Sequence, residues 1–143
     1  MITVICLADF DLPTRSASGF IIRNLMPRAG QVQLYSLLDR RRLFSAVVRQ
    51  ADLVLGVGHG DPDAFTGHKE EPLLKVGRYD QGEAKGKVIK LLSCEVGAEL
   101  GPDLVENGVA SFQGYVDDYL WVMDADMIST PWADKLAAPV LMP

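Results

Sequence analysis

Two side chains capable of nucleophilic catalysis follow two apolar stretches of this chain. His59 comes after Leu53–Val57, and Cys94 comes after Val88–Leu92. A thiolate is a strong nucleophile, and a neighbouring imidazole can stabilise it and transfer its proton. If the two stretches are adjacent parallel strands, about 4.8 Å apart, their reactive side chains meet at one edge of the sheet. The sequence therefore predicts a Cys94–His59 catalytic dyad.

The backbone around these residues suits the same chemistry. Gly58 and Gly60 flank His59, which allows a sharp turn and leaves room for a substrate chain. We expect the amides of Gly60 and Cys94 to donate to a developing oxyanion. A helix predicted over residues 98–106 starts soon after Cys94, and its dipole would favour a thiolate.

Simpler interpretations of the same residues stay open. Cys94 could be a structural residue, because a single cysteine at a strand end often only packs in the core. Cys6 lies inside an apolar run, and we expect it to be buried. His68 shares a long loop with His59 and is a second possible base. His59, Asp61, Asp63 and His68 could instead hold a metal, and the glycines near His59 superficially suggest a phosphate loop. Neither pattern has the spacing of a known motif, so we expect no metal and no cofactor.

The order of apolar runs predicts one domain over residues 1–143. Strands are predicted over 2–8, 31–37, 53–57, 88–92, 109–114 and 119–123, and helices over 19–26, 98–106 and a segment that Asp39 caps. Residues 9–18 and 58–86 are predicted as loops, the second with a short hairpin around 73–76. Alternating strands and helices favour an α/β sandwich with a mostly parallel sheet. Residues 126–143 are expected to be extended or part of a larger assembly.

Composition restricts the classes of function. The 143 residues carry a net charge of −5, which argues against nucleic-acid binding. Arg40, Arg41 and Arg42 are the one basic cluster and are expected to be a solvated helix start. With two cysteines and neither a signal-peptide nor a membrane-span pattern, the chain is expected to be cytoplasmic and not membrane-bound.

The two catalytic motifs resemble those of the caspase/gingipain-type (clan CD) cysteine peptidases and the related CHAT domains. His59-Gly60 matches the His-Gly pair of that group, and Ser93-Cys94 with Gly97 matches its cysteine motif. The resemblance implies a caspase-like three-layer α/β/α sandwich that cleaves a protein or peptide substrate. It further implies that His59 polarises the scissile carbonyl or protonates the leaving amine, and that Cys94 attacks. Because caspase-like domains can pair through an edge strand, the resemblance is also compatible with a homodimer or with another chain as partner.

The sequence does not decide whether the site selects acidic or basic substrate residues. Arg15, in the first strand-to-helix loop, could select acidic residues as an arginine of a caspase-like pocket does. Asp61, Asp63, Asp117 and Asp118 could instead select basic ones. Three aromatic residues could line a substrate cleft or pack in the core or a lid: Tyr115, Tyr119 and Trp121. Two other functions remain alternatives, namely a catalytically inactive partner-binding module and a flavodoxin-like domain that binds a small anion.

Overall fold

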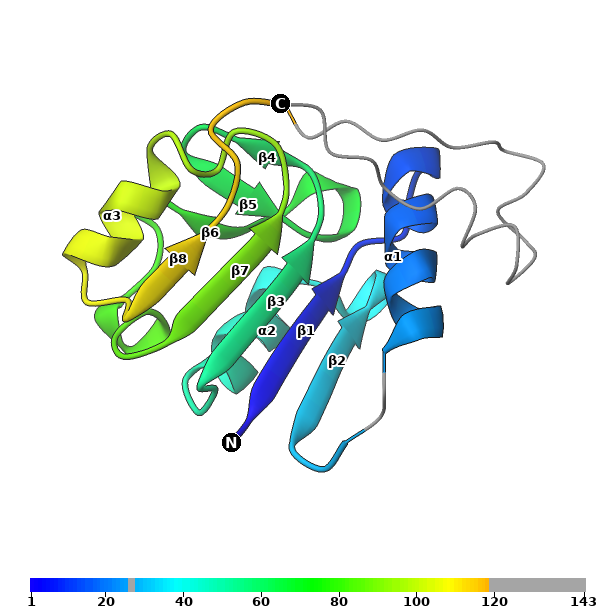
Figure 1. The fold of residues 1–143 in the computed structure, drawn as a ribbon, viewed down its shortest axis with the longest axis horizontal. Helices are drawn as coiled ribbons and strands as arrows, with labels where there is room; N and C mark the ends of the chain where they lie inside the picture. The colour runs from blue at the N-terminus through cyan, green and yellow to red at the C-terminus, as the bar shows by residue number, and fades with distance from the viewer. Residues whose placement is uncertain (26–27, 119–143) are drawn as a thin grey trace.

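The computed structural model describes residues 1–25 and 28–118 of the chain. Its centre is a five-stranded sheet in the order β2-β1-β3-β7-β8, in which every neighbouring pair is parallel (Figure 1). The strands are β1 (Thr3–Leu7), β2 (Gln31–Tyr35), β3 (Leu53–Val57), β7 (Val88–Leu92) and β8 (Ser111–Gln113). The predicted parallel sheet is therefore confirmed.

The burial of these strands follows their sequences. All five residues of β1 are buried, as expected for an apolar strand with neighbours on both sides. β2 alternates polar and apolar residues and lies at one edge of the sheet, as its pattern indicates. The strand predicted over 119–123 and the segment 126–143 lie outside the described residues.

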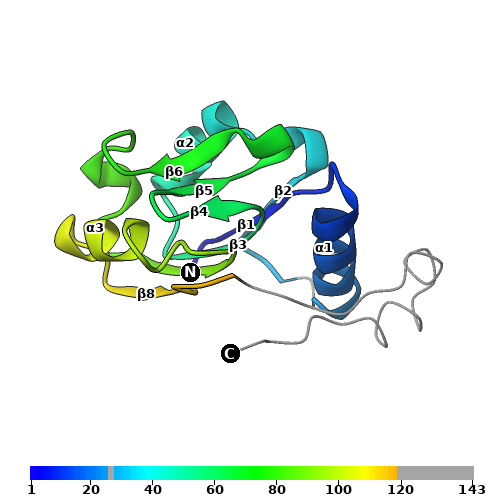
Figure 2. The same ribbon diagram turned by 90° about the horizontal axis from the view of Figure 1, so that it is seen from above.

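Helices pack on both faces of the sheet. α1 (Leu12–Asn24) lies on one face, whereas α2 (Arg41–Val48) and α3 (Leu100–Glu106) lie on the other (Figure 2). This arrangement is an α/β sandwich, as the alternation of elements predicts. Within the described ranges, no helix is long and apolar enough to cross a membrane.

The first helix begins earlier than the sequence analysis expected. Residues 9–18 were predicted as a loop, but α1 already starts at Leu12. Asp11 is its N-cap, and the Asp11 and Thr14 side chains form a reciprocal capping box. Pro13 is tolerated because the first turn needs no amide donor. As a consequence, Arg15 lies on a helix and not in a loop.

The stretch 58–86 is also more ordered than predicted. It contains a second, antiparallel sheet of β4 (Gly60–Asp61), β5 (Ala64–Thr66) and β6 (Pro72–Lys75). The same stretch contains two short 3-10 helices, at His68–Glu70 and Gln81–Glu83. A third 3-10 helix, outside this stretch, lies at Ser36–Leu38. Phe65, Leu73 and Leu74 are fully buried and join the core beneath α2 and α3. The small sheet therefore packs on the same face of the central sheet as these helices.

The start of α2 corrects another prediction. Asp39 does not cap this helix, because the N-cap is Arg40 and its side chain makes no capping bond. The Glu71 carboxylate, from the turn before β6, instead accepts a bond from the Arg41 amide. A side chain distant in sequence thus satisfies one of the four amide donors that the start of a helix leaves free.

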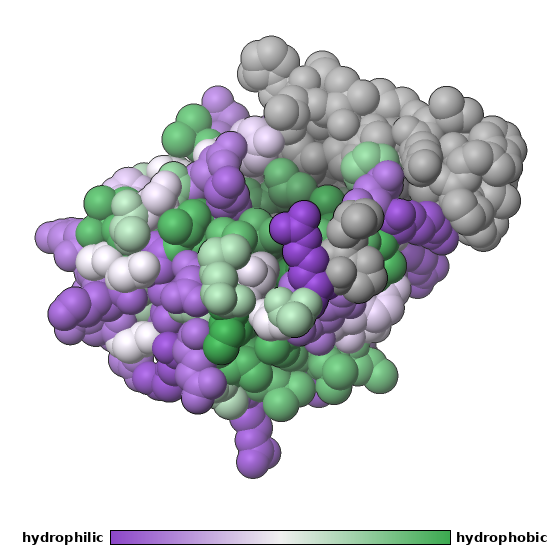
Figure 3. All heavy atoms as spheres, turned by 60° about the horizontal axis from the view of Figure 1, so that its bottom comes forward, coloured by the Kyte–Doolittle hydropathy of each residue, from purple (hydrophilic) through white to green (hydrophobic). Residues whose placement is uncertain are grey.

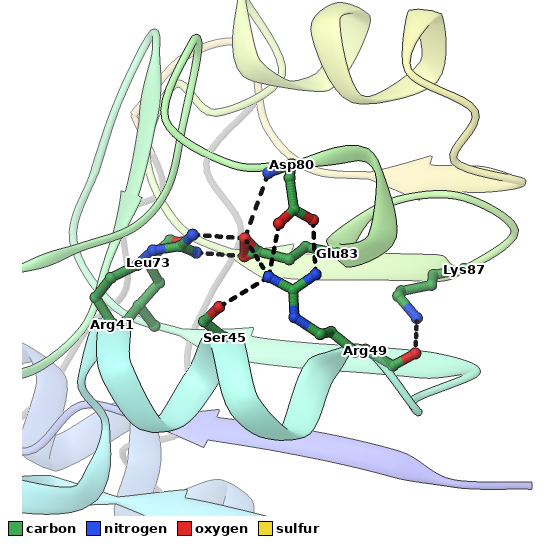
Figure 4. A network of polar contacts seen from close by, with 7 residues as sticks. All are labelled: Arg41, Ser45, Arg49, Leu73, Asp80, Glu83 and Lys87. Carbon is green, nitrogen blue, oxygen red and sulfur yellow. Dashed lines mark hydrogen bonds and ion pairs between the residues drawn. The ribbon is translucent and has the colours of Figure 1, made fainter.

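A buried ion pair joins α2 to the segment before β7. Glu83 is fully buried, and both of its oxygens accept bonds from the Arg41 guanidinium (Figure 4). Arg41, predicted as part of a solvated basic cluster, is therefore a structural partner. On the solvent side of this pair, Arg49 bonds Asp80. Removing one partner of a buried pair costs far more than breaking an exposed one.

We expect Glu83→Gln to lower the free energy of unfolding by about 3 kcal/mol, because it leaves the Arg41 charge without its buried counter-ion. Urea denaturation measures this loss. Asp80→Asn is the matched control, because it removes one charge from the exposed pair, and it should leave the urea midpoint nearly unchanged. Equal effects of the two substitutions would contradict a structural role for the buried pair.

Candidate active site

His59 and Cys94 lie at equivalent positions of two paired strands. β3 and β7 are parallel neighbours whose last paired residues are Val57 and Leu92. Each reactive residue comes two positions after its strand's last paired residue, so both lie at the carboxyl edge of the sheet. The predicted juxtaposition of the two strand ends is confirmed.

The glycines beside His59 serve close packing. A Cβ at Gly60 would lie 2.3 Å from both the Cys94 carbonyl oxygen and the Ser93 Oγ, nearer than real Cβ contacts come. A Cβ at Gly58 would lie 2.2 Å from the Thr66 carbonyl oxygen. These glycines were expected to make room for a substrate. In the structure, they make room for the Cys94 segment and for β5, which brings the His59 and Cys94 backbones together.

A carboxylate holds the His59 ring. The imidazole Nε2 lies 2.6 Å from Asp11 Oδ2, and both side chains are about one-third exposed. The edge of the Phe10 ring packs against the imidazole, with centroids 5.7 Å apart. The Thr66 amide and hydroxyl both donate to the His59 carbonyl. Ring and backbone of His59 are therefore both fixed.

Asp11 fixes the tautomer of this imidazole. Burial alone would raise the pKa of Asp11, but hydrogen bonds from Thr14 and His59 outweigh it and leave that pKa below its usual value. An ionised carboxylate can only accept, so His59 Nε2 carries the hydrogen. The neutral ring then presents Nδ1 as its proton acceptor. A base oriented by a third group is the arrangement found in catalytic triads.

Sequence reasoning missed Asp11 because it treated residues 9–18 as a loop. The signal was present, since Asp11 follows the first strand and precedes Pro13 and Thr14 as a helix N-cap would. Even so, an N-cap assignment alone does not place Asp11 beside His59. That contact exists because β1 and β3 are neighbours and both end at the same edge.

Cys94 is partly exposed and forms no disulfide. The next residue, Glu95, has a positive φ of 62°, an uncommon conformation for a side chain of this kind. Its amide donates to the Asp117 carbonyl, which ties the turn after β7 to the segment after β8. α3 starts at Leu100, with Glu99 as its N-cap, so no helix begins directly after Cys94 as the predicted start at residue 98 suggested.

The predicted specificity residues divide into two groups. Arg15 lies on α1 and pairs with Asp9 at 3.3 Å. Asp61, Asp117 and Asp118 are exposed, and all three lie in segments that follow strands at the carboxyl edge. Asp63, in contrast, pairs with Lys75 of β6. The Asp117 carbonyl accepts a bond from the Glu95 amide, and Gly60 packs on Cys94, so segments with exposed carboxylates flank the turn after Cys94.

The competing interpretations of this region are not supported. His68 is buried, and Phe10 stacks edge-on against it as well as against His59, so His68 does not share the exposed edge. In the part of the chain that the structure describes, no three His, Cys, Asp or Glu side chains are close enough to hold a metal. The proposed phosphate loop runs into β4 and not into a helix, and so lacks an anion-binding helix terminus.

The location of the site follows from the strand order. If the five strands of the central sheet are numbered 1 to 5 in chain order, their order across the sheet is 2-1-3-4-5. The connections therefore change direction between the first and third of these strands, which are β1 and β3. Ligands of open α/β sheets bind in the crevice at such a point. Asp11 follows β1 and His59 follows β3, so the Asp11–His59 pair spans this position. No protein-family model, curated protein or solved structure matches the chain.

A second group of ionisable side chains lies in the core of the protein. Asp39 is fully buried, and neither carboxyl oxygen makes a well-formed hydrogen bond among the described residues. The thiol of Cys6, a weak donor, lies beside it, and Glu71 adds negative charge nearby. Burial, followed by Glu71, raises the pKa of Asp39 to about 8 although the thiol opposes this shift. Burial and Asp39 in turn raise the pKa of Cys6, which behaves as the buried core residue that was predicted.

This burial makes stability depend on pH. An unfolded chain ionises aspartate near pH 4, whereas folded Asp39 stays protonated up to about pH 8. Between these values the unfolded state binds fewer protons, so the Asp39 contribution to stability decreases as pH rises. We therefore expect Asp39→Asn to gain stability over the natural chain between about pH 5 and pH 8. Urea unfolding at the two pH values measures this gain, with Asp61→Asn as the charge control. A difference that stays constant with pH would contradict the buried, protonated carboxyl.

Proposed function

We propose that this chain is a cysteine endopeptidase with a caspase-like fold and a Cys94–His59 dyad. The observation that carries the proposal is the matched position of the two residues beyond the paired ends of β3 and β7. The Asp11 carboxylate on His59 Nε2 adds the orienting group that such a dyad needs. The fold supports the proposal only at the level of a parallel α/β sandwich with its site at the carboxyl edge.

In the proposed reaction, His59 Nδ1 takes the proton of the Cys94 thiol as its sulfur attacks the scissile carbonyl. The resulting tetrahedral oxyanion is held by backbone amides, for which Gly60 and Cys94 remain our predictions. His59 then gives its proton to the leaving amine, and the C–N bond breaks to leave a thioester. Water, deprotonated by His59, hydrolyses the thioester and restores the thiol. Asp11 keeps the ring oriented and stabilises its positive charge throughout.

The two alternative functions fit the site less well. A small-anion-binding domain needs donors and positive charge at the strand ends, but Asp9, Asp11 and Asp61 follow strands there. An inactive partner-binding module has no need of a histidine held by a carboxylate. Reactivity of Cys94 therefore separates the proposed enzyme from the anion-binding domain, and peptide turnover separates it from the inactive module.

The first test is the rate at which iodoacetamide labels Cys94 near neutral pH. We expect His59→Ala to slow labelling several-fold, because the imidazole no longer takes the thiol proton. Asp11→Asn should slow it less. Asparagine is an equally good N-cap, so this variant keeps the α1 cap and removes only the charge beside His59.

Cys6 is the internal control for this experiment, since it is fully buried in the same molecule. Cys94 labelling as slow as that of Cys6, or equal in the natural chain and His59→Ala, would disprove the dyad. Labelling that depends on His59 without any peptide turnover would instead favour the inactive partner-binding module.

We further propose that the substrate carries a basic residue next to the cleaved bond. Exposed Asp61 and Asp117 lie in segments beside the Cys94 turn, whereas Arg15 is paired with Asp9. Peptides cleaved after Arg or Lys should therefore turn over faster than those cleaved after Asp. Asp117→Asn should reduce this preference through a higher KM, whereas Asp63→Asn, which removes a carboxylate paired with Lys75, should not. Preference for acidic peptides would contradict this assignment.

A further inference from the structure

The two faces of the central sheet are covered unequally. One face lies under α2, α3 and the small antiparallel sheet. On the other face, α1 is the one covering helix among residues 1–25 and 28–118, and it packs on β1 and β3 (Figures 1 and 2). Parallel sheets are normally buried on both faces, but no helix of the described residues covers the β7–β8 half of this face.

An apolar groove follows the uncovered half. A hollow of about 270 Å³ lies between α1 and β7, with Ile21, Leu25, Leu55 and Leu92 among its walls. A second hollow of about 320 Å³ continues it toward the start of β1 and shares Leu25 and Leu55. Figure 3 shows this side obliquely, with apolar side chains exposed in the upper part of the view. Open apolar grooves of this kind mark surfaces that another element covers.

The chain itself supplies a segment suited to this groove. Tyr115 lines the first hollow, and residues 119–143 begin only four positions later. This segment contains Leu120, Val122 and Ile128 together with both tryptophans of the chain, Trp121 and Trp132. Its apolar content matches an apolar groove that begins where the described chain ends.

The charge and the length of residues 119–143 both suit the groove. The groove is flanked by two cations, Lys90 and Arg28. Residues 119–143 carry three aspartates, Asp124, Asp126 and Asp134, against one lysine, Lys135, so their charge is complementary. Even as a helix, 25 residues span roughly 37 Å, about twice the width of a five-stranded sheet.

We propose that residues 119–143 dock in the groove between α1 and β7 and bury the second face of the central sheet within one chain. This proposal does not depend on the proposed chemistry of Cys94. It assigns Trp121 to packing against the sheet, one of the two roles that the sequence left open for this residue, and it gives Trp132 the same role.

Tryptophan fluorescence tests the proposal directly, because both fluorophores lie in the proposed occupant. In the full chain we expect emission at shorter wavelength, and weaker acrylamide quenching, than in urea. Leu55→Glu places a charge in the groove and should move emission and quenching toward the unfolded values. Val105→Glu is the matched control, because Val105 is an exposed apolar residue on α3, on the opposite face, and it should change neither.

Lys90→Glu keeps the test valid if Leu55→Glu does not fold. Lys90 is exposed at the groove, so its charge reversal spares the core while repelling the acidic segment, and it should shift emission in the same direction. Far-UV circular dichroism checks that each variant is folded. Emission already at the unfolded wavelength, or unaffected by both groove variants, would overturn the proposal. A blue shift that appears only as the protein dimerises with concentration would overturn it in favour of a second copy.

Discussion

Parallel pairing of β3 with β7 is the constraint on which the rest of this structure depends. The pairing of Val57 with Leu92 puts the next residues of both strands at the same height, so His59 and Cys94 emerge together. A shift of one residue would send one of the two side chains to the opposite face. The absence of a side chain at Gly60 then lets the two turns approach within contact distance.

Strand order adds what pairing alone cannot supply. Because β1 lies next to β3, the cap of α1 reaches the histidine, and one carboxylate serves two purposes. Asp11 closes the first turn of a helix through Thr14 and orients an imidazole through its other oxygen. Helix stability and ring orientation are therefore coupled, so the same residue that starts α1 also defines the tautomer of His59.

The core on the α2 side of the sheet fixes the small antiparallel sheet, which lies in the chain between β3 and β7. Phe65 and Leu74 anchor the small sheet in the core, and the Arg41–Glu83 pair joins α2 to the segment that leads into β7. The Thr66 bonds to the His59 carbonyl extend this support to the site itself. The α2 side of the sheet thus supports the turn that carries His59, while the α1 side has an apolar groove among the described residues.

The sequence was sufficient to predict the central strands, their parallel arrangement and the neighbouring strand ends that carry His59 and Cys94, because apolar runs and glycine turns are local signals. It did not reveal the Asp11–His59 contact, the small sheet within 58–86 or the capping of α2 by Glu71. Each of these joins segments more than about a dozen residues apart or relies on short strands with weak patterns. Asp39 shows the reason most clearly. Its residue type favours a helix cap, but packing against Cys6 and Gly67 buries it, so tertiary structure decided the role that local propensity had suggested.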